Sequence, residues 1–256
     1  MSNPDKLAIV IPAYNEPNID KTLNGLYLQA QRPDGTRHYI VDNSSTDDTR
    51  ARIDAFIKNH DDFPLTVIEE PQKGTGAAVD TGFRTAIDQG YPLLARTDAD
   101  TVPTPLWTAW ISHDFGYNEN LQLLGGKSSP LHDEHYRLGD TLLLPAAVNA
   151  ARMVLSLQHL DPAYLKAVVG HNMATRASAY DAVGGIERSS IDLLDEDIDY
   201  SLKIARQYGR DAIKIDSYVE VETSMRRIRQ YGIAGTALHH LFPGFRKYRK
   251  GGVDVR

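Results

Sequence analysis

The sequence predicts an α/β protein with a Rossmann-like, mostly parallel central sheet flanked by helices. In the first hundred residues, short apolar runs rich in β-branched residues alternate with longer segments of helical period. This alternation is typical of βαβ crossovers and a parallel sheet. Polar clusters follow the apolar runs, as expected where a ligand binds beyond the carboxyl ends of parallel strands.

The first hundred residues contain four predicted strands with a helix between each consecutive pair. The strands are expected at residues 7–12, 39–41, 65–68 and 93–95. Helical spacing is carried by Ile19, Leu23, Leu26 and Ala30, then by Ile53, Ala55, Phe56 and Ile57, and then by Ala78, Phe83, Ala86 and Ile87. Each strand–helix junction therefore presents a loop at the same edge of the sheet.

The pattern is less regular after residue 101. A helix is expected near 106–115, opened by Pro103 and Pro105 because proline fits a first helical turn. Further helices are expected at 142–157 and at 195–207, where acids in the first turn suit the helix dipole. Strands are expected near 121–125 and 212–221. We find no repeat, linker or low-complexity stretch, so we expect one continuous domain.

Composition excludes several classes of protein. The chain has 256 residues, 28 Lys+Arg and 34 Asp+Glu, and a formal net charge of −6, which argues against a dedicated nucleic-acid binder. It has no cysteine, which excludes disulfides, thiolate metal sites and a cysteine nucleophile and fits a reducing compartment. The first apolar run is too short for a signal peptide, and no run of 18 apolar residues predicts a membrane-spanning helix. We therefore expect a cytoplasmic protein.

The net charge is unevenly distributed. Residues 225–256 hold 8 Lys+Arg and 1 acid, whereas residues 1–224 hold 20 basic and 33 acidic residues. Residues 230–245 contain no Asp, Glu, Lys or Arg, and a basic cluster follows at 246–250. Two interpretations stay open: a C-terminal helix packed on the domain, or peripheral contact with an anionic membrane surface.

An Asp-x-Asp pair, Asp98 and Asp100, ends the fourth predicted strand. Two carboxylates at i and i+2 on a turn can face one cleft, and Mg²⁺ takes few protein carboxylates plus substrate phosphates. Such a pair also matches often by chance. Its position at the carboxyl end of a strand favours a cation site.

Four acids between residues 195 and 199 open the last predicted helix. Their mutual repulsion is unfavourable for packing, and one of them can serve as a general base of raised pKa. Acids also stabilise a helix N-terminus, so both interpretations stay open.

Residues 73–78, with the sequence KGTGAA, precede the third predicted helix. They can offer backbone N–H groups and a cation to a phosphate. The segment is neither a P-loop nor a Rossmann fingerprint, so by itself it indicates little more than a strand-to-helix turn.

Taken in order, these motifs resemble the family 2 glycosyltransferases, which have the GT-A fold and use nucleotide-diphosphate sugars. The matching segments are 11–16, 41–47, 73–78, 98–100 and 196–197, within roughly residues 6–230. The resemblance implies a GT-A domain over residues 1–229, with a nucleotide-sugar half at about 6–100 and an acceptor half at 101–229. The apolar and basic tail at 230–256 follows.

The resemblance also implies roles for individual residues. The implied donor-binding residues are Pro12, Ala13, Tyr14, Glu16, Asp42, Lys73, Gly76, Asp98, Ala99 and Asp100. Among them, Asp100 is the implied ligand of a divalent cation, Mg²⁺ or Mn²⁺. Asp197 is the implied catalytic base, and Glu196 orients it or touches the donor. The residues expected on the acceptor side are His171, Gly184, Gly185 and Arg226.

The chain departs from the family pattern at two places. Asn43 stands where the family often has a second aspartate, which leaves the preference for the base open. Residues 221–227 lack the late histidine that some relatives place on the metal. Contact of Arg226 or Arg227 with the diphosphate, or simple exposure to solvent, therefore stays open.

These roles predict metal-dependent transfer of a sugar from a nucleotide-diphosphate sugar to an acceptor hydroxyl, with inversion. The acceptor class, whether glycan, lipid-linked or small molecule, stays open, and no nucleic-acid partner is expected. Three alternatives also stay open: a sugar-phosphate nucleotidyltransferase, a non-catalytic nucleotide-sugar-binding module and a retaining transferase of the same fold. The first of these usually has a Gly-rich, cationic loop after the first strand, which residues 12–16 lack.

Overall fold

The computed structural model describes residues 6–188, 196–226 and 229. The expected tail at 230–256 lies outside the described residues. The elements of the first half are β1 (Leu7–Ala13), α1 (Ile19–Tyr27), β2 (Arg37–Asp42), α2 (Thr49–Asn59), β3 (Leu65–Glu69), α3 (Thr75–Asp88) and β4 (Leu93–Thr97). Those of the second half are β5 (Thr101–Pro103), α4 (Trp107–Tyr117), β6 (Leu123–Pro130), α5 (Asp140–His159), η1 (Pro162–Lys166), β7 (Asn172–Arg176), α6 (Ala177–Ala182), α7 (Glu196–Tyr208), η2 (Arg210–Ala212) and β8 (Ile213–Thr223).

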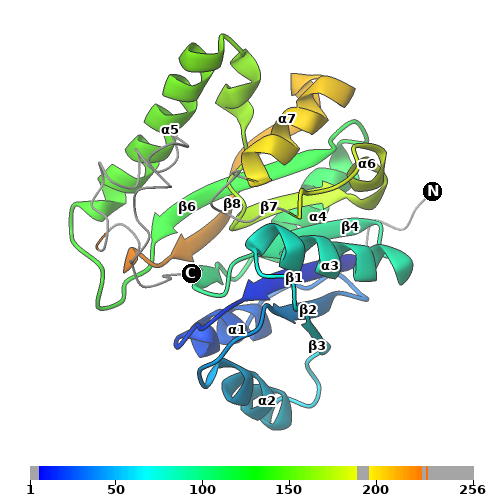
Figure 1. The fold of residues 1–256 in the computed structure, drawn as a ribbon, viewed down its shortest axis with the longest axis vertical. Coiled ribbons are helices and arrows are strands. Elements are labelled where there is room, and N and C mark those ends of the chain that lie inside the picture. The colour runs from blue at the N-terminus through cyan, green and yellow to red at the C-terminus, as the bar shows by residue number, and fades with distance from the viewer. Residues whose placement is uncertain (1–5, 189–195, 227–228, 230–256) are drawn as a thin grey trace.

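One sheet runs through both expected halves, with the strand order β3-β2-β1-β4-β7-β6-β8-β5 (Figure 1). Strands β3, β2, β1 and β4 are mutually parallel, and β6 is parallel to β8. Strand β7 is antiparallel to both β4 and β6, and β5 is antiparallel to β8. The prediction of an α/β protein with a mostly parallel sheet is confirmed.

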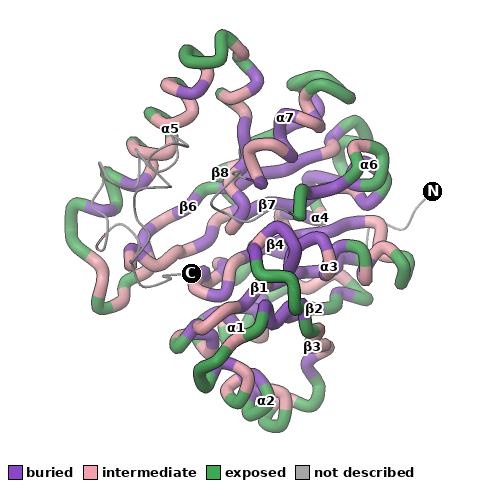
Figure 2. Tube along the Cα trace, in the orientation of Figure 1, coloured by how far each residue is buried: buried purple, intermediate pink, exposed green. Residues whose placement is uncertain are grey.

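Each face of the sheet has its own apolar core. Along β1, Leu7, Ile9 and Ile11 pack with residues of α1 and α4 on one face. The alternate residues Ala8 and Val10 pack with residues of α3 and α7 on the other face. Because helices cover both faces, the whole of β1 is apolar rather than alternating, and the buried trace runs through the middle of the molecule in Figure 2.

The helix expected near 106–115 is present as α4, but the role given to Pro103 is wrong, and one strand is not predicted. Pro103 ends the short strand β5 instead of opening a helix, and α4 begins only at Trp107. Strand β5 is the last in the sheet order, where a residue without an N–H is tolerated. The segment that forms β7, Asn172–Arg176, is not predicted as a strand at all. Its five residues alternate little, and pairing with both β4 and β6 holds it in the sheet.

Candidate active site

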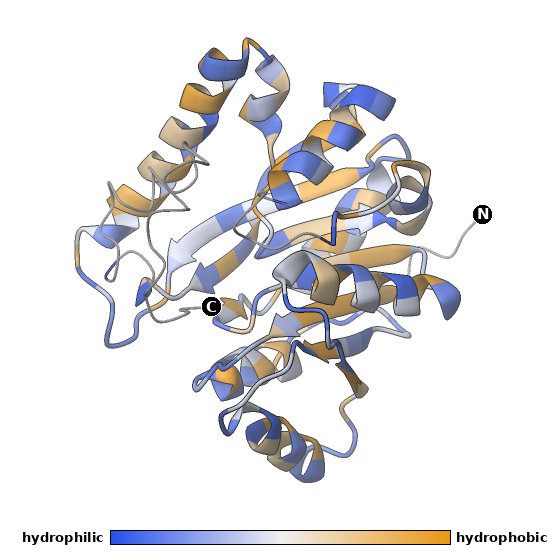
Figure 3. Cartoon of the chain, viewed as in Figure 1, coloured by the Kyte–Doolittle hydropathy of each residue, from blue (hydrophilic) through white to orange (hydrophobic). Residues whose placement is uncertain are grey.

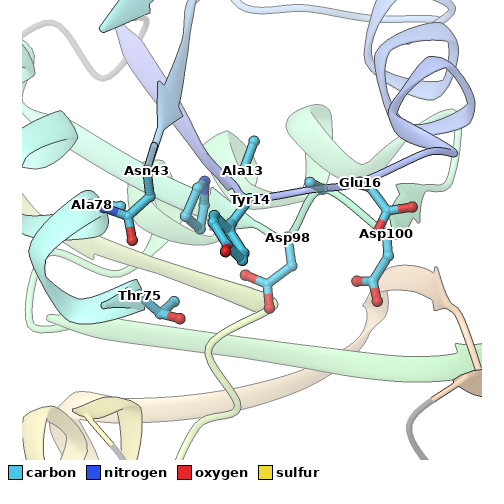
Figure 4. Close-up of a pocket in the computed structure, with 10 residues that line it drawn as sticks. Ala13, Tyr14, Glu16, Asn43, Thr75, Ala78, Asp98 and Asp100 are labelled. Atoms are coloured by element: carbon cyan, nitrogen blue, oxygen red, sulfur yellow. The ribbon is translucent and has the colours of Figure 1, made fainter. Parts of the chain in front are cut away.

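A cleft lies where β1, β2 and β4 end and their loops meet. Its volume is about 520 Å³, including its open mouth, and its lining is Pro12, Ala13, Tyr14, Glu16, Asn43, Thr75, Ala78, Asp98, Ala99 and Asp100. Figure 4 shows the carboxylates of Asp98 and Asp100 on the same side of their loop. Seven of the ten residues predicted to bind a donor line this cleft.

The other three predicted donor residues lie around the cleft but do not line it. The Asp42 carboxylate accepts a hydrogen bond from the backbone N–H of Ser45 at 3.0 Å, which closes the turn after β2. The Lys73 ammonium lies 5.2 Å from the ring centroid of Tyr14 and so reaches the cleft wall. A Cβ at Gly76 would lie 2.2 Å from the carbonyl oxygen of Glu187. Glycine at position 76 is therefore required by packing.

The side chain of Asn43 explains why an amide stands at this position. Its Nδ2 donates to the carbonyl oxygens of Glu70 at 2.9 Å and Gln72 at 2.7 Å. Its Oδ1 accepts from the backbone N–H of Gly74 at 2.8 Å. An ionised carboxylate is an acceptor only, so it cannot make the first two bonds. Asn43 therefore holds the loop between β3 and α3 in place.

Arg96, on β4, connects the cleft to the acids at the start of α7. Its Nε donates to Asp98 at 2.9 Å and its Nη1 donates to Glu196 at 3.2 Å, and its exposed fraction is only 3%. Burial raises the pKa of Glu196, and the charge of Arg96 opposes that rise. A Cβ at residue 170 would lie 2.6 Å from Nη1, so Gly170 leaves the space that this guanidinium occupies.

Sequence analysis overlooked Arg96. The available signal was a single cation directly after the apolar run at 93–95 and two residues before Asp98. A buried cation in a central strand needs anionic partners, and that requirement points to the acids nearby.

Asp197 is held in the first turn of α7 by two backbone groups. Its Oδ2 accepts from the N–H of Gly170 at 2.7 Å, and its Oδ1 accepts from the N–H of Ile198 at 2.8 Å. His171, next to Gly170, has its Nε2 at 2.7 Å from the hydroxyl of Ser128 on β6. The predicted catalytic acids and His171 thus gather around the loop that precedes β7.

Arg226, predicted on the acceptor side, lies beside two residues that line the cleft. Its Nη2 is 2.6 Å from Oε2 of Glu16 and 3.5 Å from Oδ2 of Asp100. The chain after β8 reaches this position because the N–H of Ser224 donates to the carbonyl oxygen of Asp100 at 3.1 Å. The Arg226 side chain is only 19% exposed, so the simple exposure to solvent that the sequence left open does not describe it.

Gly184 and Gly185 form the turn that ends α6. Both have positive φ, +78° and +73°, which favours glycine. The N–H of Gly185 donates to the carbonyl oxygen of Tyr180 at 2.9 Å, as in a helix C-terminal turn. Neither glycine is among the residues that line the cleft.

The residues present suit a cation that is shared with a substrate. The part of the chain that the structure describes has no group of three or more His, Cys, Asp or Glu residues placed to hold a metal ion. The Asp100 side chain is 29% exposed and faces the cleft beside Glu16. Mg²⁺ and similar ions bind through one or two carboxylates when substrate phosphates and water complete the shell. Asp100 fits that kind of site.

Comparisons with known proteins agree with this geometry. Residues 8–109 match the model of the family described as Glycosyl transferase family 2. Glycosyltransferase AglE of Haloferax volcanii is 32% identical over 102 residues, which are 40% of this chain and 32% of AglE. The match thus spans about a third of that relative. The match to the family model ends at residue 109, before the acids at the start of α7.

Solved structures share the fold over nearly the whole chain. The mannosyltransferase PcManGT from Pyrobaculum calidifontis, in complex with GDP-Man and Mn²⁺, has a TM-score of 0.64 at 18% identity and is matched over 94% of this chain and 71% of its own. Glucosyl-3-phosphoglycerate synthase from Mycobacterium tuberculosis, with Mn²⁺, UDP-glucose and phosphoglyceric acid, also has a TM-score of 0.64 at 18% identity, over 97% of this chain and 82% of its own. The chain thus shares the GT-A fold of these solved glycosyltransferases, and its residues 8–109 match the model of family 2 glycosyltransferases.

Proposed function

We propose that the protein transfers a sugar from a nucleotide-diphosphate sugar to a hydroxyl group of an acceptor, with inversion at the anomeric carbon. One observation carries this proposal. The buried guanidinium of Arg96 is bonded to Asp98, which lines the cleft, and to Glu196, which precedes Asp197. The donor cleft and the proposed base are therefore connected through one buried ion pair network.

The cleft supplies the groups that a donor needs. Acidic and small residues line its floor, and the Lys73 ammonium and the Arg226 guanidinium lie at its walls near Tyr14 and Asp100. Two cations suit the charge of a diphosphate. The relatives with solved complexes bind GDP-Man and UDP-glucose with Mn²⁺, which supports a donor of this class.

A divalent cation, Mg²⁺ or Mn²⁺, held by Asp100 would neutralise negative charge on the diphosphate when bound. The remaining work falls to side chains of this chain. Arg226 pairs with Glu16 and Asp100 and so sets the position of both carboxylates beside the cleft. Arg96 does the same for Asp98 and Glu196.

Asp197 acts as the general base in this proposal. Its two backbone hydrogen bonds, from Gly170 and Ile198, fix the position of the carboxylate at the start of α7. The carboxylate takes the proton of the acceptor hydroxyl as that oxygen bonds to the anomeric carbon. The bond between the anomeric carbon and the diphosphate breaks on the opposite face, and its electron pair leaves with the nucleoside diphosphate. Single displacement inverts the configuration.

The test is a reaction with GDP-mannose or UDP-glucose, Mn²⁺ and a panel of hydroxyl acceptors. Release of nucleoside diphosphate, and a product of opposite anomeric configuration by NMR, is the expected result. Pyrophosphate release from a nucleoside triphosphate and a sugar phosphate would instead identify a nucleotidyltransferase. Donor binding without any turnover, across the panel, would identify a binding module.

A further inference from the structure

The outward face of α5 carries a continuous apolar stripe. Leu142, Ala146, Ala150, Met153 and Leu157 follow one another at intervals of three or four residues, and all five are exposed. The exposed fractions of the three largest side chains, at positions 142, 153 and 157, are 79%, 59% and 64%. We call these five residues the α5 stripe. Residues at this spacing lie on one side of a helix.

The charged side chains of α5 turn away from this face. Asp140 is only 2% exposed. The Arg152 guanidinium donates through Nε to the carbonyl oxygen of Ala167 at 2.9 Å, on the domain side. Leu144 and Leu155 are buried on that same side. The Asp and Arg of α5 thus both lie toward the packed face, and the stripe contains no charged side chain. The polar Asn149, which is exposed and accepts from Arg152 Nη1 at 3.4 Å, lies beside the stripe.

Helix α5 is unusually long and apolar for a helix that is mostly exposed. It is the helix, among those described, whose length and mean hydropathy of 1.2 over 18 residues suffice to cross a membrane. Core helices of soluble proteins are often as long and as apolar, but they are mostly buried. In α5, only 17% of the 18-residue stretch is buried. One face of α5 packs against the domain through Arg152. The helix can therefore lie along the surface of a membrane, but it cannot cross the membrane without losing this packing. Figure 3 shows the helix at the margin of the molecule.

The position of Arg229 links this stripe to a basic segment of the chain. Its Nε donates to the carbonyl oxygen of His135 at 2.8 Å, and its guanidinium pairs with Asp140, the first residue of α5. Arg229, the last residue that the structure describes, therefore lies at the N-terminal end of α5. In sequence, the segment after it has no charge over 230–245 and the cluster Arg-Lys-Tyr-Arg-Lys at 246–250.

We propose that the α5 stripe docks on the surface of an anionic lipid bilayer. Apolar burial and attraction of basic residues to anionic headgroups are the two contributions that together give stable peripheral binding. The α5 stripe supplies the apolar contribution, and the basic residues at 246–250 of the same chain supply the electrostatic one. A stable contact between two proteins buries roughly 800 Å² per partner, with about 20–30 residues a side. The five side chains of the α5 stripe offer a much smaller contact area than a stable protein–protein interface needs. The proposal does not depend on sugar transfer.

Vesicle co-sedimentation of the full chain tests the proposal. The expected result is binding to vesicles of phosphatidylcholine mixed with phosphatidylglycerol, reduced by high salt and by neutralising residues 246–250 to glutamine. The triple variant L142Q/M153Q/L157Q is expected to bind at least about tenfold more weakly, since it removes three apolar side chains from the contact. The control is Leu28→Gln, which removes a leucine of 67% exposure at the end of α1. Equal binding by the triple variant and the control would overturn the proposal.

A site-specific label separates a lipid occupant from other occupants. The chain has no cysteine, so Met153→Cys creates a single labelling site. A polarity-sensitive fluorophore there is expected to shift to the blue when vesicles are added, whereas the same label at Leu28→Cys is not. A label at position 153 that is already shielded from iodide without vesicles would overturn the proposal, because the chain itself or a second copy would then cover the stripe. Light scattering would tell those two cases apart.

Discussion

Arg96 Nη1 lies 3.2 Å from Oε1 of Glu196, although 100 positions separate the two residues in the chain. Both side chains are buried, and Asp98 occupies the other side of the same guanidinium. One cation thus holds a carboxylate from the end of β4 and one from the start of α7. Any change in Arg96 acts on both sides of the proposed site at once.

We expect Arg96→Met to lower the free energy of unfolding by about 3–5 kcal/mol, because it removes the cation that pairs with the buried carboxylate of Glu196 and with the partly exposed carboxylate of Asp98. Urea unfolding followed by circular dichroism measures this change. Arg50→Met is the control, since Arg50 pairs with Asp54 on the surface of α2 and such pairs contribute at most about 1 kcal/mol. If the two variants are equally stable, Arg96 does not hold the acids together.

We expect Asp197→Asn to reduce transfer by about 10²–10⁴-fold while donor affinity changes little, because the amide cannot take up the proton of the acceptor. Single-turnover kinetics and donor calorimetry give the two quantities separately. Asp199→Asn is the matched control in the same helical turn, where the native carboxylate pairs with Lys203 at 2.9 Å. Wild-type turnover by Asp197→Asn would exclude Asp197 as the base.

We expect Asp100→Ala to weaken donor binding by roughly tenfold or more in the presence of Mn²⁺ and to have a smaller effect without it. The reason is that this carboxylate faces the cleft and is the implied cation ligand. Calorimetry with and without Mn²⁺ is the measurement. Asp54→Ala, a surface carboxylate of α2, should leave both affinities unchanged. If Mn²⁺ still strengthens donor binding in Asp100→Ala as much as in the wild type, Asp100 is not the cation ligand.

We expect Asn43→Asp to destabilise the protein by roughly 1–3 kcal/mol, because the carbonyl oxygens of Glu70 and Gln72 would lose their donor and face a carboxylate. Urea unfolding near neutral pH, where the new carboxyl group is ionised, is the measurement. Asn120→Asp, at an exposed position, controls for the added charge. A stability equal to wild type would mean that the loop before α3 does not rely on this amide.

The stability of the protein should fall as the pH is lowered from about 6.5 to about 3, in part because of His38. Burial, with a smaller contribution from the charge of Arg32, lowers the pKa of His38 to about 3. The unfolded chain therefore takes up a proton below pH 6.5 that the folded protein does not, and the contribution of His38 is fully present only above that pH. The slope is up to about 1.4 kcal/mol per pH unit.

Unfolding of His38→Leu in urea across this pH range should show a correspondingly smaller slope, whatever its absolute stability. His113→Gln, at an imidazole that is 60% exposed, should keep the slope of the wild type. Parallel slopes for His38→Leu and the wild type would contradict the buried, neutral state of His38.

Local sequence was enough to predict β1 to β4, the helices between them and most of the cleft. Apolar runs and helical spacing act between residues close in the chain, and parallel strands bring the loops after β1, β2 and β4 to one edge of the sheet. Asp98 and Asp100 could therefore be placed at the cleft before the fold was known. Strand β7 could not be predicted, because its neighbours β4 and β6 hold it in the sheet.

Contacts between distant segments depended on tertiary structure alone. The partners of Arg96 and Arg226, the three hydrogen bonds of Asn43 and the outward direction of the α5 stripe are set by how loops from different strands pack. The sequence shows that a buried arginine or asparagine needs a hydrogen-bond partner. It does not show which residue of the folded chain lies close enough to be that partner. The sequence by itself thus determined the fold class and the types of residue at the site. Only packing across the sheet decided how Arg96 joins the two sets of acids.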